Sequence, residues 1–107
     1  MSFRVKFLES AESDMDCIEE YLSQYYPSTA RNFFEQMKEK ALLLEDNPYL
    51  CPAYEDDPFF RRAVINDYLM FYSVDEKRNY VIIHRIIHSK RNISTEILEN
   101  QVSEENV

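Results

Sequence analysis

The sequence predicts an α+β domain in which an antiparallel β-sheet packs against a hairpin of two α-helices. Residues 3–8 and 61–88 show the two-residue period or the short apolar runs of strands. Residues 10–46 instead repeat apolar side chains every three to four positions, as amphipathic helices do. The chain has 107 residues, 45 % of them apolar, which is enough for one hydrophobic core. We therefore expect a single domain over residues 1–99 and a disordered tail over residues 100–107.

The first strand is predicted over residues 3–8, where Phe3, Val5 and Phe7 alternate with Arg4 and Lys6. This alternation is typical of a strand with one buried face. It supplies the N-terminal strand of the predicted sheet.

Two amphipathic helices follow, and a short link between them predicts an antiparallel hairpin. Ser10 is the expected cap of the first, which ends near Gln24, and Ser28 is the expected cap of the second, which ends at Asn47-Pro48. The predicted inner positions of the first helix are Ala11, Met15, Ile18, Leu22 and Tyr25. Those of the second are Ala30, Phe33, Phe34, Met37, Ala41 and Leu44.

Residues 47–60 contain three prolines and are predicted to form a loop. The acids Glu55, Asp56 and Asp57 within it are interpreted as a solvated surface, because no histidine or further carboxylate stands at metal-ligand spacing. No metal site is predicted.

A three-stranded meander is predicted over residues 61–65, 68–74 and 80–88. Asn66 and Asp67 suit the first turn because both tolerate positive φ, and residues 75–79 form a polar second turn. The middle strand is apolar on both faces, which predicts a central position in the sheet. A short helix is expected over residues 94–99.

Several function classes are excluded by composition. The chain has no glycine, which phosphate-cradling and dinucleotide-binding loops require, and no cofactor is predicted. The sequence contains neither a run of apolar residues long enough for a membrane span nor a secretory signal, so a cytoplasmic protein is expected. Cys17 and Cys51 are expected to be free, buried thiols.

The chain carries a net charge of −8, yet residues 61–91 are basic. They contain seven Lys or Arg against three Asp or Glu, a net charge of +4. The basic residues are Arg61, Arg62, Lys77, Arg78, Arg85, Lys90 and Arg91. Lys77 and Arg78 fall at the predicted hairpin tip, where we expect them to be solvated. Any function carried by charge is expected along the rest of this segment.

A metal-independent ribonuclease site is one interpretation of this segment. His88 could serve as general base or acid, Arg62 and Arg91 could bind the phosphate through paired hydrogen bonds, and Lys90 could add a point charge. His84 stands four residues before His88 on the predicted strand and hence on the same face, so a site with two histidines is possible. The alternative is structural: a satisfied histidine at a strand end, and arginines that pair with the acids of the helices or with an acidic partner.

The order of these elements resembles the RelE/ParE superfamily of toxins from bacterial type II toxin-antitoxin, or plasmid stabilisation, systems. The matching residues are Pro27, Ser28, Ala30, Phe33, Pro48, Arg62, Tyr68-Leu69-Met70-Phe71-Tyr72, Arg85-Ile86-Ile87-His88 and Arg91. The resemblance implies a partner antitoxin that wraps the toxin with a helix or strand. RelE-like members are ribosome-dependent mRNA endonucleases, and ParE-like members inhibit DNA gyrase. The ending RIIHSKRN is more similar to the ParE-like branch, and Ile93 stands where nuclease relatives often carry an aromatic residue.

Three hypotheses follow. The first is a growth-inhibiting, ParE-like toxin that binds DNA gyrase through Arg61, Arg62, Arg85, His88, Lys90 and Arg91. The second is a RelE-like mRNA endonuclease that acts at the ribosome with His88, Arg62 and Arg91 as its catalytic residues. The third is a non-toxic relative that only binds an antitoxin or oligomerises, which would explain the net charge of −8. The sequence leaves open a homodimer or a hetero-oligomer with the antitoxin.

Overall fold

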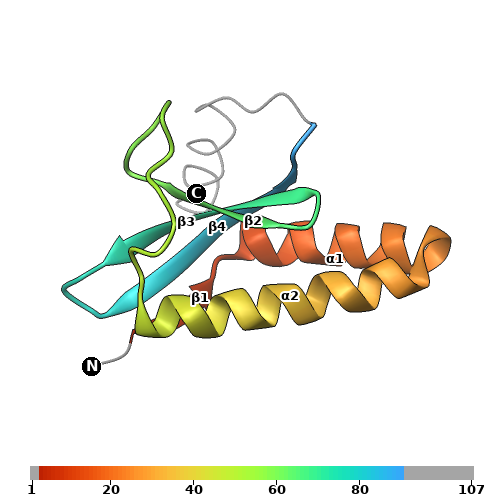
Figure 1. The fold of residues 1–107 in the computed structure, drawn as a ribbon, viewed down its shortest axis with the longest axis horizontal. Helices are drawn as coiled ribbons and strands as arrows, with labels where there is room; N and C mark the ends of the chain where they lie inside the picture. Colours follow the sequence, from red (N-terminus) through yellow and green to blue (C-terminus); the bar gives the residue numbers. More distant parts are fainter. Residues whose placement is uncertain (1–2, 91–107) are drawn as a thin grey trace.

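The computed structural model describes residues 3–90, and its elements follow the predicted order. They are β1 (Arg4–Phe7), α1 (Glu9–Tyr25), α2 (Pro27–Asp46), β2 (Arg61–Ile65), β3 (Tyr68–Asp75) and β4 (Tyr80–His88). Both helices lie on one face of the sheet, and residues 47–60 rise on the opposite side (Figure 1). The helix predicted over residues 94–99 and the tail over 100–107 lie outside the described residues.

The sheet is mixed, so the expectation of a purely antiparallel sheet was wrong. Its strand order is β1-β4-β3-β2. The predicted antiparallel meander of β2, β3 and β4 is confirmed, with β3 in the interior of the sheet. The N-terminal strand β1, however, pairs with β4 in parallel, with Val5 opposite Val81.

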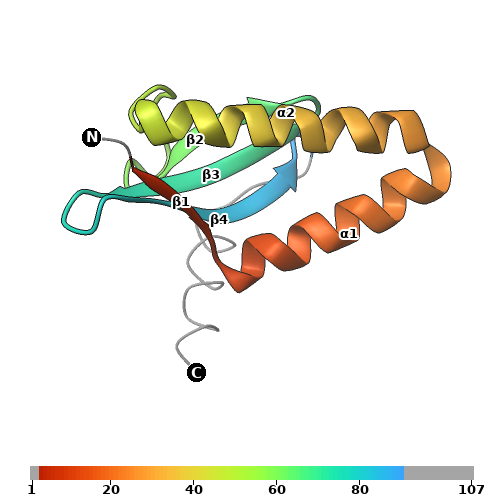
Figure 2. The same cartoon turned by 90° about the horizontal axis from the view of Figure 1, so that it is seen from below.

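The parallel pairing follows from the even number of helices between β1 and β2. α1 carries the chain away from the end of β1, and α2 brings it back to the start of β1, where Phe3 N donates to the carbonyl of Glu45 at 2.7 Å. Figure 2 shows the two helices meeting near Tyr26 and splaying apart toward β1. β2 therefore sets out in the direction of β1, and two hairpins later β4 runs in that direction again.

Neither predicted serine cap forms. Leu8 precedes α1 without a side-chain cap, and Ser10 lies inside the helix, where its hydroxyl donates to the carbonyl of His84 at 2.7 Å. α2 begins at Pro27, and its preceding residue Tyr26 likewise makes no side-chain cap. Proline suits the first helical position because its ring fixes φ at a helical value. Its lack of an N–H costs nothing there, since an N–H at this position would have no partner within the helix. The helix therefore starts one residue before the predicted cap Ser28.

The sheet is covered by apolar contacts on both faces. The larger core lies under the helices and contains Ala11, Ile18, Leu22, Ala30, Phe33, Met37, Leu44, Met70, Tyr72 and Ile83 among its buried residues. On the other face, Tyr54 and Phe60 from the proline-rich loop pack on Phe71 and Ile87. Two expectations were wrong: Tyr25, predicted to face inward, is 58 % exposed, and of the two free cysteines only Cys51 is buried.

Tyr72 connects the proline-rich loop to the sheet. Its buried hydroxyl donates to the carbonyl of Pro48 at 2.9 Å and accepts a bond from the N–H of Cys51 at 3.3 Å. Burial away from water raises the pKa of the Tyr72 hydroxyl well above its usual value of 10.0. The ionised form is therefore disfavoured in the folded protein.

Tyr72→Phe should lower the free energy of unfolding by about 1–3 kcal/mol near neutral pH, because the substitution leaves two buried backbone groups without a partner. Since the folded-state pKa is raised, the stability from neutral Tyr72 is fully present below the unfolded pKa of about 10 and is lost as pH rises above it. The difference between the two proteins should therefore narrow at higher pH. Urea denaturation near pH 7 and near pH 11 tests both effects, with the exposed Tyr25→Phe as control. An equal difference at both pH values would contradict the raised pKa.

Candidate functional site

An irregularity in β4 at His84 decides where the predicted site residues lie. Phe71 pairs with Arg85 and Tyr72 with Ile83, so the register shifts by one residue at His84 and a β-bulge forms there. Ile83 and Ile86, three positions apart, both belong to the core under the helices, whereas Ile87 packs on the opposite face. The bulge thus reverses the side-chain alternation of β4 partway along the strand.

The bulge places His84 and His88 on opposite faces, so the prediction of a shared face was wrong. His84 is buried on the loop-covered face, where its Nε2 lies 2.8 Å from the Ser73 hydroxyl and its ring centroid 5.0 Å from that of Phe60. His88 is half-buried on the helix-covered face, with its ring centroid 5.1 Å from that of Tyr68. Its Nδ1 accepts the backbone N–H of Lys90 at 3.1 Å. The two histidines therefore do not form a pair.

Arg62 lies on the opposite face of the sheet from His88. It pairs with Phe71, and residues directly opposite each other in a sheet share a face. Its exposed guanidinium carbon stands 5.8 Å from the ring centroid of Tyr54, in the loop that covers that face. A general base must come within hydrogen-bond reach of its substrate's proton while the cations hold the phosphate. The structure does not bring Arg62 and His88 together for this, and Arg91, the third predicted catalytic residue, lies outside the described residues.

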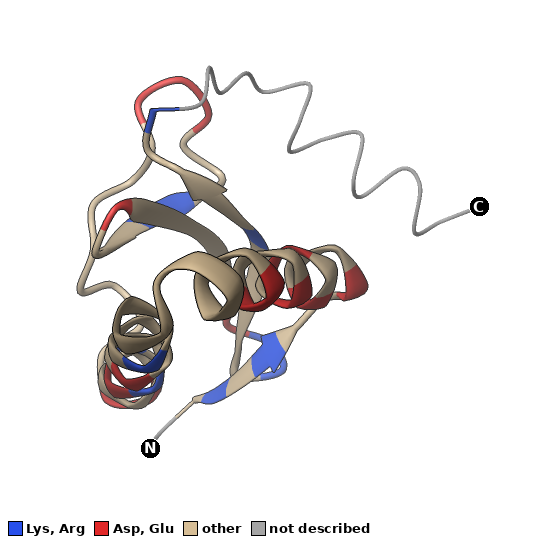
Figure 3. Ribbon diagram, turned by 90° about the vertical axis from the view of Figure 1, so that its right-hand side faces the viewer, with Lys and Arg blue, Asp and Glu red and all other residues tan. Residues whose placement is uncertain are grey.

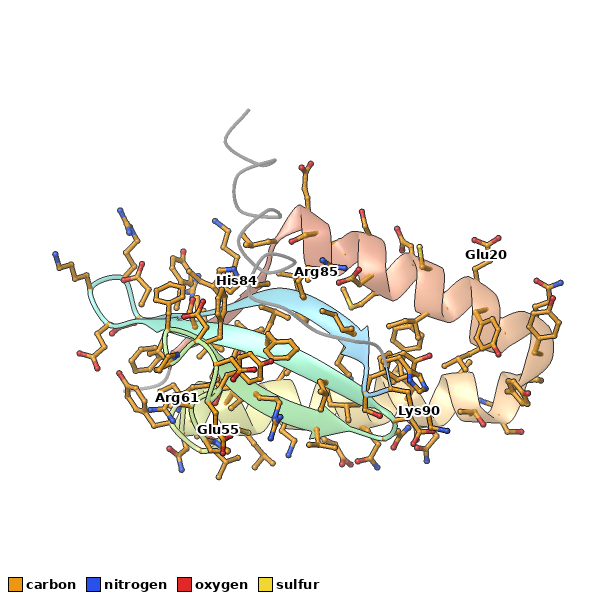
Figure 4. The ribbon with its side chains drawn as sticks, turned by 90° about the horizontal axis from the view of Figure 1, so that it is seen from above. Glu20, Glu55, Arg61, His84, Arg85 and Lys90 are labelled. Carbon is orange, nitrogen blue, oxygen red and sulfur yellow. The ribbon has the colours of Figure 1, made fainter. Side chains whose placement is uncertain are left out.

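The remaining basic residues differ in how freely they face solvent. Arg61 donates through Nη1 to the carbonyl of Cys51 at 2.6 Å and lies 4.8 Å over the ring of Tyr49, so it holds the proline-rich loop. Lys90 is exposed. Figure 4 shows Lys90 at the opposite end of the sheet from Arg61. Lys77 and Arg78 are exposed at the hairpin tip, as expected.

Arg85 forms an ion pair within the protein. Its Nε and Nη2 donate to the two carboxylate oxygens of Asp14 on α1, at 2.7 and 3.1 Å. The two side chains are only 8 % and 16 % exposed. Figure 4 shows Arg85 beside α1, next to His84. The pair leaves Arg85 little surface with which to contact a partner.

The same carboxylate completes the edge of β4. β1 pairs with β4 only as far as Ile83. Beyond this residue, the backbone groups on the β1 side of β4 need other hydrogen-bond partners. α1 supplies them, because the Ser10 hydroxyl donates to the carbonyl of His84 and Asp14 Oδ2 accepts the N–H of Ile86 at 2.9 Å. Side chains of the first turns of α1 thus replace a neighbouring strand.

A cavity of about 400 Å³, which we call the tip pocket, opens between the turn of the helical hairpin and the β2–β3 turn. It is lined by Tyr21, Leu22, Tyr26, Thr29, Phe33, Asn66, Asp67, Tyr68 and His88. Burial raises the pKa of the Tyr68 hydroxyl, with smaller contributions from the neighbouring Tyr21 and Asp67. Of these residues, only His88 was predicted from the sequence to be functional. The three tyrosines within residues 21–26 were the available signal.

Within residues 3–90, no group of three His, Cys, Asp or Glu side chains is placed to hold a metal ion. No helix in the described part of the chain is long and apolar enough to cross a membrane. Glu55 and Asp56 are exposed, as expected for a solvated surface.

Comparison with known protein families gives a match over most of the chain. Residues 5–93 match the family described as the ParE toxin of the type II toxin-antitoxin system parDE. No curated protein matches the chain by sequence.

Solved structures of toxins share this fold. The chromosomal ParDE system of P. aeruginosa contains a chain that is 16 % identical, with a TM-score of 0.69 over 83 % of this chain and 98 % of that one. A chain of the RelBE2 toxin-antitoxin complex of Mycobacterium tuberculosis is 20 % identical, with a TM-score of 0.59 over 82 % and 99 %. The isolated RelE toxin of E. coli is 18 % identical, with a TM-score of 0.61 over 97 % and 99 %. At these identities the similarity shows the fold.

Asp14→Asn should lower the free energy of unfolding by about 3–5 kcal/mol, because it leaves Arg85 buried without its counter-charge. Arg78→Gln is the matched control. It breaks the 3.0 Å pair with Asp75, in which Arg78 is 74 % exposed, and should change stability by at most about 1 kcal/mol. Urea denaturation of both variants measures the two values. Similar losses in both would contradict the structural role of Asp14.

Proposed function

Because this chain belongs to the ParE toxin family of type II toxin-antitoxin systems, we propose that it inhibits growth by binding DNA gyrase in the cytoplasm. A cognate antitoxin neutralises it in this proposal. The family match is the observation that carries the proposal. It covers residues 5–93, which include β1 to β4 and the basic residues Lys90 and Arg91 that follow β4. A role in plasmid stabilisation would follow from the same pairing of toxin and antitoxin.

The geometry favours a binding toxin over a ribonuclease. Cleavage of RNA through its 2′-hydroxyl needs a base and a phosphate clamp around one reacting group. Arg62 and His88 occupy opposite faces of the sheet, and the Nδ1 of His88 is already engaged by Lys90. Exposed Arg62 and Lys90 instead suit contact with a macromolecular surface.

The alternative remains a RelE-like mRNA endonuclease, with Arg62, His88 and Arg91 as its catalytic residues. The fold shared with the RelE toxin of E. coli over 97 % of this chain favours it. In that case the three residues would have to converge on one RNA phosphate at the ribosome. The net charge of −8 favours the third hypothesis, a non-toxic antitoxin-binding relative.

The antitoxin is proposed to dock its apolar residues between the two helices. An apolar cavity of about 280 Å³ lies there, lined by Phe7, Met15, Phe34, Met37, Lys38 and Ala41. The similar chains from M. tuberculosis and P. aeruginosa belong to toxin-antitoxin systems. The M. tuberculosis chain was solved as part of the toxin-antitoxin complex. Grooves of this kind receive the apolar face of an amphipathic helix.

We expect the purified protein to inhibit DNA supercoiling by gyrase. Arg62→Ala and Lys90→Ala should each weaken inhibition about tenfold, because each removes an exposed cation from the proposed contact surface. Lys77→Ala, an exposed cation at the β3–β4 turn, is the matched control and should inhibit like the unmodified protein. Full supercoiling at a large molar excess of folded protein would contradict the proposal.

Messenger RNA followed in the same expressing cells separates the two toxin mechanisms. The gyrase proposal predicts intact mRNA in cells that express either the unmodified chain or His88→Ala. Cleaved mRNA that becomes intact when Arg62, His88 and Arg91 are all replaced by alanine would establish the nuclease alternative instead. Normal growth of cells that express the chain without its antitoxin would support the non-toxic relative.

A further inference from the structure

The tip pocket combines aromatic rings with negative charge. We propose that it binds the guanidinium of an arginine side chain presented by a partner protein. The pocket lies apart from exposed Arg62, which is on the opposite face of the sheet. This inference concerns a partner of the toxin but does not depend on which target the toxin inhibits.

The aromatic part of the lining comes from α1, α2, β3 and the junction between the two helices. Tyr21 of α1, Tyr26 of the helix–helix junction, Phe33 of α2 and Tyr68 of β3 all face the cavity. The ring centroids of Phe33 and Tyr68 are 5.0 Å apart, and those of Tyr21 and Tyr26 are 6.2 Å apart. The face of an aromatic ring attracts a cation that lies over it. Tyr21 and Tyr26 remain 51 % and 54 % exposed, so a ligand can reach them.

The polar part of the lining favours a cation that donates hydrogen bonds. Asp67 is exposed at the pocket and has no ion-pair partner within residues 3–90. Asn66 donates its side-chain N–H to Asn32 at 3.1 Å, which leaves its carbonyl oxygen as an acceptor. The Nδ1 of His88 accepts the backbone N–H of Lys90, so this nitrogen does not donate to the acceptors of the pocket.

The charged residues of α1, which supplies Tyr21 and Leu22 to the pocket, are all acidic. α1 contains six Asp or Glu and no Lys or Arg, and Figure 3 shows red without blue along this helix. One of the six, Asp14, is neutralised by Arg85. Lys90 lies close to His88 in sequence but does not line the cavity. The helix therefore attracts cations toward the pocket and repels phosphate groups.

Arginine fits this lining better than lysine. Its planar guanidinium stacks on aromatic faces, donates several hydrogen bonds in fixed directions and is less strongly hydrated than an ammonium group. Asp67 and the carbonyl oxygen of Asn66 supply acceptors, while the tyrosine rings supply the faces. A neutral isostere of arginine would keep the shape but lose the charge.

The probe for this inference is N-acetyl-arginine amide, followed by NMR on the isotope-labelled full chain. We expect saturable shifts confined to the residues of the tip pocket, and none of comparable size with N-acetyl-citrulline amide. Asp67→Asn and Tyr21→Leu should each weaken binding about tenfold. The first removes the negative charge at the pocket, and the second removes an aromatic ring from its lining. Asp16→Asn removes an equal charge from an exposed position of α1 outside the pocket and should weaken binding less than about twofold.

Three results would overturn the inference: shifts spread along α1, equal weakening by Asp16→Asn and Asp67→Asn, or equal binding of the citrulline compound. The dispersion of the amide spectrum checks the fold of each variant. If Tyr21→Leu disturbs the fold, the binding affinities of Asp67→Asn and Asp16→Asn for the arginine compound still test the inference. Because no gyrase, ribosome or antitoxin is present, failure of the gyrase proposal would leave this test unaffected.

Discussion

The Asp14 carboxylate holds α1 against β4 at the point where β1 no longer covers that strand. It accepts hydrogen bonds from the Arg85 side chain and from the N–H of Ile86, while Ser10 satisfies the carbonyl of His84. A sheet edge is normally completed by another strand or left to water. Here a helix completes it with two side chains, which allows β1 to be only four residues long.

The bulge at His84 separates the basic segment into two surfaces. The face covered by the proline-rich loop carries Arg62 and the buried Ser73–His84 hydrogen bond, and the helix-covered face carries His88 and the tip pocket. Charged residues that are close in sequence thus serve different purposes. Arg61 and Arg85 stabilise the fold through internal contacts, whereas Arg62 and Lys90 remain exposed. This division favours two binding surfaces over one reaction centre.

The order of strands and helices was predictable because hydrophobic periodicity depends only on which residues face the core. The direction of β1 was not read from the sequence, since it depends on the path of the whole chain through two helices. The His84 bulge was missed for a related reason: the run from Tyr80 to His88 is apolar on both faces, so a one-residue shift leaves no trace in the pattern. The tip pocket was not predicted, because Asp67 was interpreted only as a turn residue. Tyr21, which lines the same pocket, lies 46 positions before Asp67 in the sequence.

The central claim is that His88 lies under the helices while Arg62 lies on the opposite face. Nuclear Overhauser effects from the His88 ring measure this arrangement directly in solution. The structure predicts contacts from that ring to the side chain of Tyr68 and to other residues of the tip pocket. Contacts from the His88 ring to the side chains of Phe71 or Arg62 would instead show a regular β4 and would contradict the account.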